Sequence, residues 1–211
     1  MPKKQIHFQN DIKKIFKTYI PNYKLSKKVK DILNIFIIKF IDDIVNHSKK
    51  LMKKNKDKKV ITSKIIQEII IKINDHNYSK HLVSEGVKAY TLFSNWKRNS
   101  SKKRTSMSQK AKVIISVTKV KNLLKKSGYK VDDGAAVYLS GSLDFILIDL
   151  FELAFSSCRY RNAKIVNITD LYNIVQQDTI LTKLFKKLKI KLNKKPKRKR
   201  RSRKLKGRKT K

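Results

Sequence analysis

A basic pattern that occurs twice constrains the fold of this 211-residue chain more than any other feature. Tyr23-Lys24-Leu25-Ser26 has a counterpart in Tyr129-Lys130-Val131-Asp132, and Lys59-Val60-Ile61-Thr62 has one in Lys164-Ile165-Val166-Asn167. The copies lie about 105 residues apart, and about 35 residues separate the two segments within each half. A repeat at this spacing predicts two copies of one supersecondary unit in a single chain.

The first half has the apolar periodicity of three helices and an added fourth. We expect a short helix over 8–20, a long helix from an N-cap at Ser26 to about residue 54, and a third helix that ends at Ile73. Thr62 or Ser63 can cap the third helix. The added helix covers 78–95 and is amphipathic.

The second half repeats this order of elements. The pattern predicts a short helix over 111–126 and a long helix over 135–161 after an N-cap at Asp132 or Asp133. Thr169 can cap a short helix that runs to about Gln177. A further basic helix is expected to end near residue 191.

A long helix between two short ones cannot bury all its apolar faces alone, but two such units clasped together can. We therefore expect an all-α fold in which the halves form an intramolecular pseudo-dimer. This geometry places the first loop of one half beside the second loop of the other, where the repeated segments could pair as short strands. The expected divisions are 1–96 and 111–191 for the two folds, 97–110 for a basic linker and 192–211 for a disordered basic tail.

Lys and Arg total 54 against 15 Asp and Glu, a formal net charge of +39. Such a chain is expected to bind a polyanion, because its charge attracts phosphate and repels another copy of itself. The apolar runs are interrupted by charged residues, so no membrane span is predicted. We find no glycine-rich phosphate loop, and the four histidines and Cys158 lack metal-ligand spacing. We therefore expect neither an enzyme nor a cofactor or metal site.

The first half resembles core histone 2B. The strongest match is Lys80-His81-Leu82-Val83-Ser84-Glu85-Gly86-Val87-Lys88-Ala89, which is nearly identical to a run in that family. Val60-Ile61-Thr62-Ser63-Lys64 matches the segment that enters the family's third helix, and residues 26–55 align with its long helix without a gap.

The second half resembles core histone 2A. Lys119-Val120 with Leu123-Leu124-Lys125-Lys126 matches the family's first helix, and Ala136-Val137-Tyr138-Leu139 with Phe151-Glu152-Leu153-Ala154 matches its long helix. Together the two resemblances cover roughly residues 8–190. Fused histone doublets of this kind are typical of large DNA viruses, so the resemblance implies two tandem histone folds that package double-stranded DNA.

The resemblance also implies where DNA binds. Histones insert basic groups at each inward-facing minor groove and bind phosphates with helix N-termini, without reading bases. The residues assigned to DNA in this way are Lys24, Lys27, Lys58, Lys59, Thr62, Lys119, Lys125, Lys126, Lys130 and Lys164. Lys119 and Lys164 stand where ordinary histone 2A has arginine. Because lysine lacks the planar fork of arginine, a less tightly wrapped particle is expected.

The family's acidic patch, which docks basic peptides, is thinned in this chain. The residues that correspond to it are Glu85, Asp144, Asp149, Glu152 and Asp178. Asp178 is followed by Thr179 and Ile180 where the family has two more acids, and Asn77 replaces another. The alternative for these acids is a role in helix solubility and local pairing with lysines.

The expected partners are double-stranded DNA and a histone 3–histone 4-like pair or doublet. The basic run 194–201 could serve as a nuclear import signal, and the expected location is the virion together with the host nucleus or viral factory. Two alternatives remain open. One is a histone-fold transcription factor that bends DNA at chosen sites, and the other is a basic RNA-binding protein.

Overall fold

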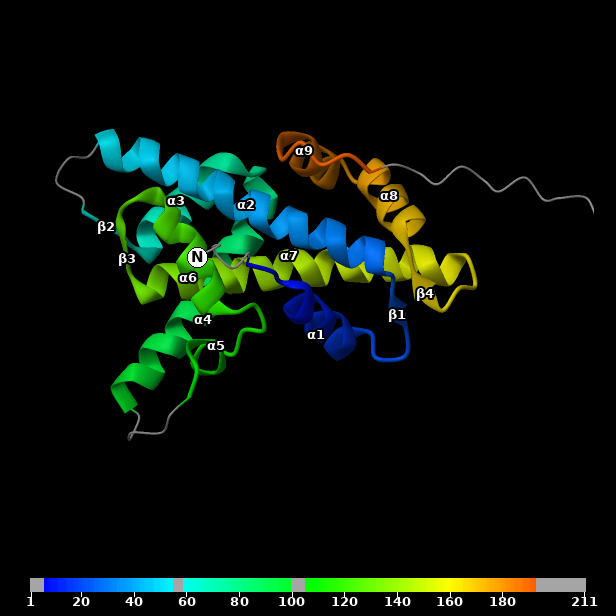
Figure 1. Cartoon of the computed structure of the whole chain (residues 1–211), viewed down its shortest axis with the longest axis horizontal. Helices are drawn as coiled ribbons and strands as arrows, with labels where there is room; N and C mark the ends of the chain where they lie inside the picture. Colours follow the sequence, from blue (N-terminus) through cyan, green and yellow to red (C-terminus); the bar gives the residue numbers. More distant parts are fainter. Residues whose placement is uncertain (1–5, 55–58, 100–104, 193–211) are drawn as a thin grey trace, which may run out of the picture.

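The computed structural model describes residues 6–54, 59–99 and 105–192 (Figure 1). The first half consists of α1 (Gln9–Tyr19), β1 (Lys24–Leu25), α2 (Lys27–Lys54), β2 (Val60–Ile61), α3 (Ser63–Ile73) and α4 (His76–Asn99). The second half consists of α5 (Met107–Lys110), α6 (Val117–Leu124), the 3-10 turn η1 (Lys125–Ser127), β3 (Lys130–Val131), α7 (Asp133–Tyr160), β4 (Ile165–Val166), α8 (Ile168–Gln177) and α9 (Thr179–Lys187). The all-α fold class is confirmed.

The two long helices begin where the repeated segments end. Ser26 accepts a hydrogen bond from the Val29 N–H at 3.4 Å, and Asp132 accepts one from the Gly134 N–H at 3.0 Å, as helix N-caps do. Each helix has 28 residues and is therefore about 42 Å long. Each long helix thus joins two strand segments at opposite ends of the molecule.

The halves pack on each other through these long helices. α2 contacts α6 and α8 of the second half, and α7 contacts α1, α3 and α4 of the first half. Aromatic rings pack at these contacts: Phe16 of α1 and Phe151 of α7 meet edge to face, with their ring centroids 5.1 Å apart. The buried residues of both halves form one hydrophobic cluster. The two tandem folds therefore form the expected intramolecular pseudo-dimer.

Helix α7 is the centre of this core. By length and composition it could cross a membrane, because its most apolar 18-residue window has a mean hydropathy of 1.5. Of that window, 83% is buried inside the protein. Helices from both halves surround α7, and their packing explains why it is apolar on nearly every face.

Two glycines allow α4 to approach α7 closely. A Cβ on Gly86 would lie 2.5 Å from the Tyr138 ring, and a Cβ on Gly141 would lie 2.7 Å from the backbone oxygen of Glu85. Both distances are shorter than the contacts that Cβ atoms make in folded proteins. The glycine within the histone 2B-like run is therefore required by helix packing.

The structure corrects several expected boundaries. Asn167, and not Thr169, caps α8, because its side chain accepts hydrogen bonds from two backbone amides of the first turn. The helix expected over 111–126 begins only at Val117, after a turn in which Lys112 has φ +53°. Within the expected linker, α4 continues to Asn99 and α5 forms behind a capping box of Ser106 and Gln109. The expected disordered tail lies outside the described residues from 193 onward.

Candidate nucleic-acid interface

The repeated segments meet in parallel pairs, one at each end of the long helices. At one end β1 pairs with β4, and the Lys24 N–H donates to the Lys164 carbonyl at 3.0 Å. At the other end β2 pairs with β3, and the Asp132 N–H donates to the Ile61 carbonyl at 3.0 Å. We call residues 23–27 with 159–167 the first paired loop and residues 59–62 with 125–132 the second. The expected strand pairing across the halves is confirmed.

Parallel pairing has an electrostatic consequence. Because both strands of a pair run in the same direction, the helices that follow them begin side by side (Figure 1). The first paired loop therefore presents the N-termini of α2 and α8, and the second presents those of α3 and α7. The first turns of α2 and α3 contain no acidic residue. Unpaired amides and the helix dipole favour an anion at such ends.

The first paired loop brings three of the expected lysines together. Lys24, Lys27 and Lys164 are all exposed. The Lys164 Nζ lies 5.2 Å from the centre of the Tyr23 ring, and that ring meets Phe155 edge-on at 4.7 Å. The Lys164 ammonium group thus lies over the Tyr23 ring, which attracts the cation, while the residue remains exposed.

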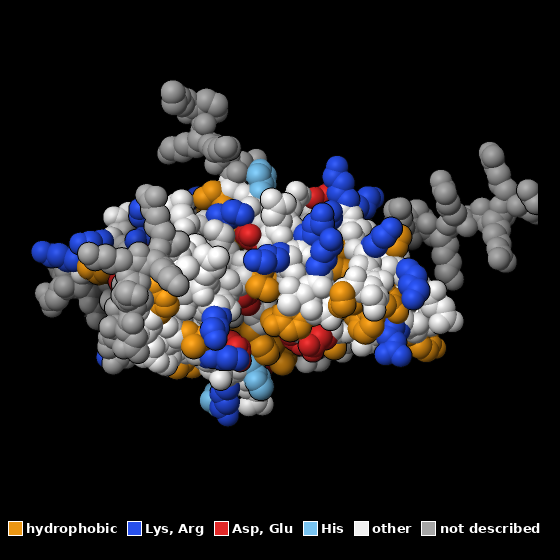
Figure 2. Space-filling view, turned by 90° about the horizontal axis from the view of Figure 1, so that it is seen from below, with side chains coloured by type: hydrophobic (Ala, Val, Ile, Leu, Met, Phe, Trp, Pro, Cys, Tyr) orange, Lys and Arg blue, Asp and Glu red, His pale blue; other side chains and the backbone are white. Residues whose placement is uncertain are grey.

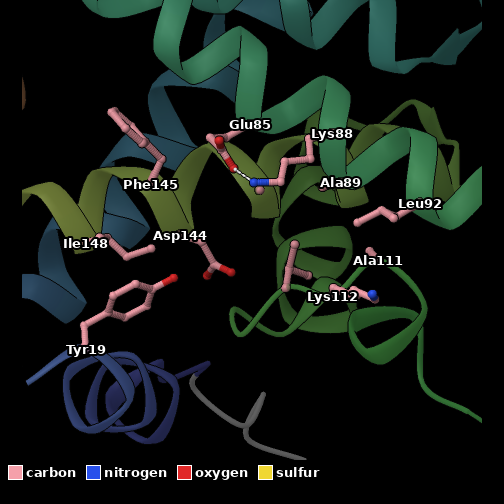
Figure 3. Close-up of a pocket in the computed structure, with 12 residues that line it drawn as sticks. Tyr19, Glu85, Lys88, Ala89, Leu92, Ala111, Lys112, Asp144, Phe145 and Ile148 are labelled. Atoms are coloured by element: carbon pink, nitrogen blue, oxygen red, sulfur yellow. Dashed lines mark hydrogen bonds and ion pairs between the residues drawn. The ribbon is translucent and has the colours of Figure 1, made fainter. Parts of the chain in front are cut away.

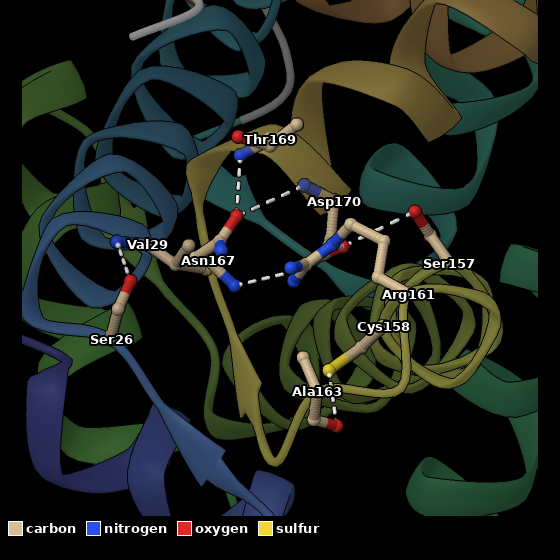
Figure 4. A network of polar contacts seen from close by, with 9 residues as sticks. All are labelled: Ser26, Val29, Ser157, Cys158, Arg161, Ala163, Asn167, Thr169 and Asp170. Atoms are coloured by element: carbon tan, nitrogen blue, oxygen red, sulfur yellow. Dashed lines mark hydrogen bonds and ion pairs between the residues drawn. The ribbon is translucent and has the colours of Figure 1, made fainter. Parts of the chain in front are cut away.

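A polar network fixes the turn that carries Lys164 (Figure 4). Arg161 donates from Nε and Nη2 to the two carboxylate oxygens of Asp170, at 2.7 and 2.6 Å. Asp170 is fully buried and also accepts the Asn167 N–H at 2.8 Å and the Ser157 hydroxyl at 3.3 Å. Hydrogen bonding to this carboxylate raises the pKa of Arg161 above its ordinary value. Sequence reasoning missed this pair, because its members lie on different elements.

The second paired loop carries Lys59 and Lys130, which are both exposed. Thr62 is the N-cap of α3 but makes no capping hydrogen bond through its side chain. Its hydroxyl is therefore not committed to its own helix. Asp132 places a carboxylate in this loop, so the loop combines cations with one acid. Lys58, which was also expected here, lies outside the described residues.

The lysines expected on the first helix of the second half differ in availability. Lys125 is exposed on η1. Lys119 forms an ion pair with Asp11 at 3.0 Å, and Lys126 forms one with Asp42 at 3.6 Å. The Lys126 pair is well exposed, so its attraction is weak and a phosphate can compete for the lysine. Lys119 is more enclosed, and Asp11 offsets more of its charge.

Two of the five expected acids, Glu85 and Asp144, line one pocket (Figure 3). Of these, Asp144 has a structural role. Asp144 accepts the N–H groups of Ile114 and Ile115 at 2.6 and 2.9 Å, and burial raises its pKa to about 6. Glu85 forms an exposed ion pair with Lys88 at 3.3 Å. The pocket has a volume of about 360 Å³. Asp144 thus anchors the segment before α6.

The other acids gather near a pocket of about 270 Å³. Asp149 accepts the Tyr78 hydroxyl at 3.2 Å, and Asp178 caps α9. Burial raises the pKa of Asp149, and the charges of Asp178 and Glu152 add to that effect. Phe145 lines both pockets, so the two acidic groups are neighbours. Figure 2 shows Lys and Arg side chains spread over one face, with acids at only a few points among them.

Comparisons with known proteins identify a histone-like relative of this chain. No protein-family model matches the chain. The chain is 31% identical over 104 residues to a histone doublet of Melbournevirus, in which histone 2B is fused to histone 2A. The resemblance to a viral histone doublet is confirmed. The matched stretch covers 48% of this chain and 38% of the Melbournevirus doublet.

A solved structure, that of the histone from Methanopyrus kandleri, also resembles this chain. It superposes with a TM-score of 0.49 at 17% identity, over 79% of this chain and 91% of the histone chain. The similarity to the viral doublet agrees with the expectation of a non-enzymatic structural protein. Among the described residues, no group of three His, Cys, Asp or Glu side chains is arranged to hold a metal ion.

Proposed function

We propose that this protein binds and compacts double-stranded DNA without reading its sequence, as a fused histone doublet in a nucleosome-like particle. The observation that carries the proposal is the pair of paired loops, each with exposed lysines and one helix N-terminus whose first turn has no acidic residue, that of α2 in the first loop and that of α3 in the second. Backbone phosphates are the ligand that both features select. Neither feature recognises bases, so the contacts position DNA without specifying sequence.

The spacing of the two loops supports wrapping of the duplex. Each long helix separates its two loops by about 42 Å. One turn of B-DNA spans about 34–36 Å. A straight duplex as long as one of these helices makes about 1.2 turns, and a duplex that curves around the protein follows a longer path. More than one inward-facing minor groove can therefore meet this surface. Histone octamers are the reference example of this binding mode.

The proposed partners and location follow from the similarity to histones. A histone 3–histone 4-like pair or doublet would complete the particle, which would form in the virion and in the host nucleus or viral factory. The lysines at positions 119 and 164 favour a less tightly wrapped particle, because lysine is more strongly hydrated than arginine.

Nuclease digestion tests the proposal. DNA reconstituted with the full chain, alone and with a histone 3–histone 4 pair, should yield fragments of discrete length. Changing Lys59 and Lys164 to Ala removes one cation from each paired loop. The protected fragments should then become shorter or lose their discrete length. A control with Lys80 and Lys186 changed to Ala removes the same charge from exposed helical positions and should leave that length unchanged.

Two further measurements separate the alternatives. Deleting residues 194–211 should weaken binding but preserve the protected length; loss of the discrete fragment on this deletion alone would identify a tethered polycation. A plot of the logarithm of the binding constant against the logarithm of the salt concentration should have a slope of about −0.9 for each phosphate that the protein neutralises. Protection of one particular sequence would favour a transcription factor, and preference for RNA in competition would favour an RNA-binding protein.

A further inference from the structure

Tyr160 is the most exposed large hydrophobic residue among the described parts of the chain. Its exposed fraction is 93%, against 49% for Tyr19 and 48% for Ile71. It is the last residue of α7 and precedes the turn that leads into β4. A tyrosine that projects fully into water gains nothing from the core, so its side chain is free to bind a partner.

The backbone that carries Tyr160 is held rigidly. On its C-terminal side Arg161 is fixed to the buried carboxylate of Asp170 by two hydrogen bonds. The turn is closed by the Ala163 N–H, which donates to the Cys158 carbonyl at 3.2 Å, and by the Cys158 thiol, which donates to the Ala163 carbonyl at 3.2 Å (Figure 4). These hydrogen bonds fix the backbone from which the ring projects, which lowers the backbone entropy lost on binding.

Cations lie close to Tyr160 along the chain, with Arg159 directly before it and Lys164 four residues after it. Arg159 lies over the Phe155 ring at 5.7 Å, and Lys164 lies over the Tyr23 ring at 5.2 Å. The two rings touch each other at 4.7 Å, so Arg159 and Lys164 belong to the same surface. Ile165 in β4 adds apolar area with an exposed fraction of 47%.

The second paired loop lacks this feature. Among its described residues none is an exposed large hydrophobic side chain. Both paired loops carry lysines, but only the first has exposed large hydrophobic residues among its own members. At the second end Tyr90 of α4, with an exposed fraction of 38%, lies beside Gly134. Electrostatic attraction to phosphate does not explain the apolar surface of the first loop.

We propose that Tyr160, together with Ile165, contacts the deoxyribose edge and minor-groove wall of DNA at the first paired loop. This inference rests on the proposed function and adds a contact that salt does not screen. Where Lys24 and Lys164 hold phosphates, the surface that DNA presents between the phosphates is sugar and base edge, and apolar side chains fit it. A protein partner fits less well, because protein docking sites are contiguous apolar patches of several hundred Å².

Salt titrations of DNA binding by the full chain test the inference. Tyr160→Ser should weaken binding about tenfold at every salt concentration and leave the salt slope unchanged. Lys164→Ala should instead reduce the slope by about 0.9. Tyr160→Phe should bind like the wild type. Tyr19→Ser, which alters a half-exposed tyrosine at the pocket beside Asp144, is the matched control and should have no effect. Circular dichroism should show unchanged helicity for each variant.

A fluorescence measurement provides an independent readout. Tyr160→Trp in a Trp96→Phe background leaves a single indole in the chain, and its emission should change when DNA binds. If Tyr160→Ser binds DNA like the wild type at all salt concentrations, the inference fails while the proposed function stands. An indole that responds only to a histone 3–histone 4 pair also overturns it. If the wild-type chain does not bind DNA at all, the proposed function itself fails.

Discussion

Replacing Arg161 by Met should destabilise the protein more than any other exposed charge substitution near the first paired loop. The Asp170 carboxylate is fully buried and receives four hydrogen-bond donors, two of which come from Arg161. Removing one partner of a buried ion pair costs about 3–5 kcal/mol, because it leaves an uncompensated charge. The Arg161 side chain is 32% exposed, so water can partly replace it. We therefore expect a loss near the lower limit, about 3 kcal/mol.

Guanidinium unfolding followed by circular dichroism measures this loss as a lower midpoint at unchanged slope. Arg159→Met is the matched control, because Arg159 is exposed and its guanidinium group lies over the Phe155 ring at 5.7 Å. Its cost should stay below about 0.5 kcal/mol. Adding Asp170→Asn to Arg161→Met should recover part of the stability, since the unpaired charge is then gone.

The outcome that refutes this reasoning is specific. If Arg161→Met costs no more than Arg159→Met, the guanidinium of Arg161 does not neutralise Asp170 in solution. A double variant that is less stable than Arg161→Met alone would show that the hydrogen bonds of the carboxylate, and not its charge, dominate. In the first case the turn that carries Lys164 would not depend on this pair.

Three other predictions follow from the packing of the two halves. Gly141→Ala should lower the free energy of unfolding by about 1–3 kcal/mol, because its Cβ would lie 2.7 Å from the Ala89 Cβ; an unchanged unfolding midpoint would disprove the close crossing. Folding raises the pKa of Asp144 from 3.8 to about 6, so the wild type should gain stability relative to Asp144→Asn as pH falls through about 6. The gain should be complete below about pH 4 and reach at most about 3 kcal/mol; parallel pH profiles of the two proteins would contradict it. Residues 1–100 and 105–211 made separately should aggregate and recover helicity on mixing, whereas two stable monomeric halves would exclude the shared core.

The sequence alone determines the order of elements and the main features of the interface. Apolar periodicity is a local property, so it places α1, α2 and α3 within a few residues of their observed limits. The repeated basic segments predict both strand pairs, because two copies of one unit that clasp each other with antiparallel long helices bring the first loop of each half to the second loop of the other. The resemblance to core histones assigned DNA contacts to Lys24, Lys27, Lys59, Lys130 and Lys164, and all five are exposed in the paired loops.

The tertiary structure decides what each charged side chain does. Lys119 was expected to bind DNA, but Asp11, 108 positions away, comes within 3.0 Å of it. Asp144 was expected on an acidic surface, but it accepts backbone amides from a segment 30 residues earlier. Arg161 meets Asp170 only because the chain turns between α7 and α8. Helical spacing orders residues along one element, whereas ion pairs and close contacts depend on where separate elements meet, so only the packed fold distinguishes a lysine that faces solvent from one that is already paired.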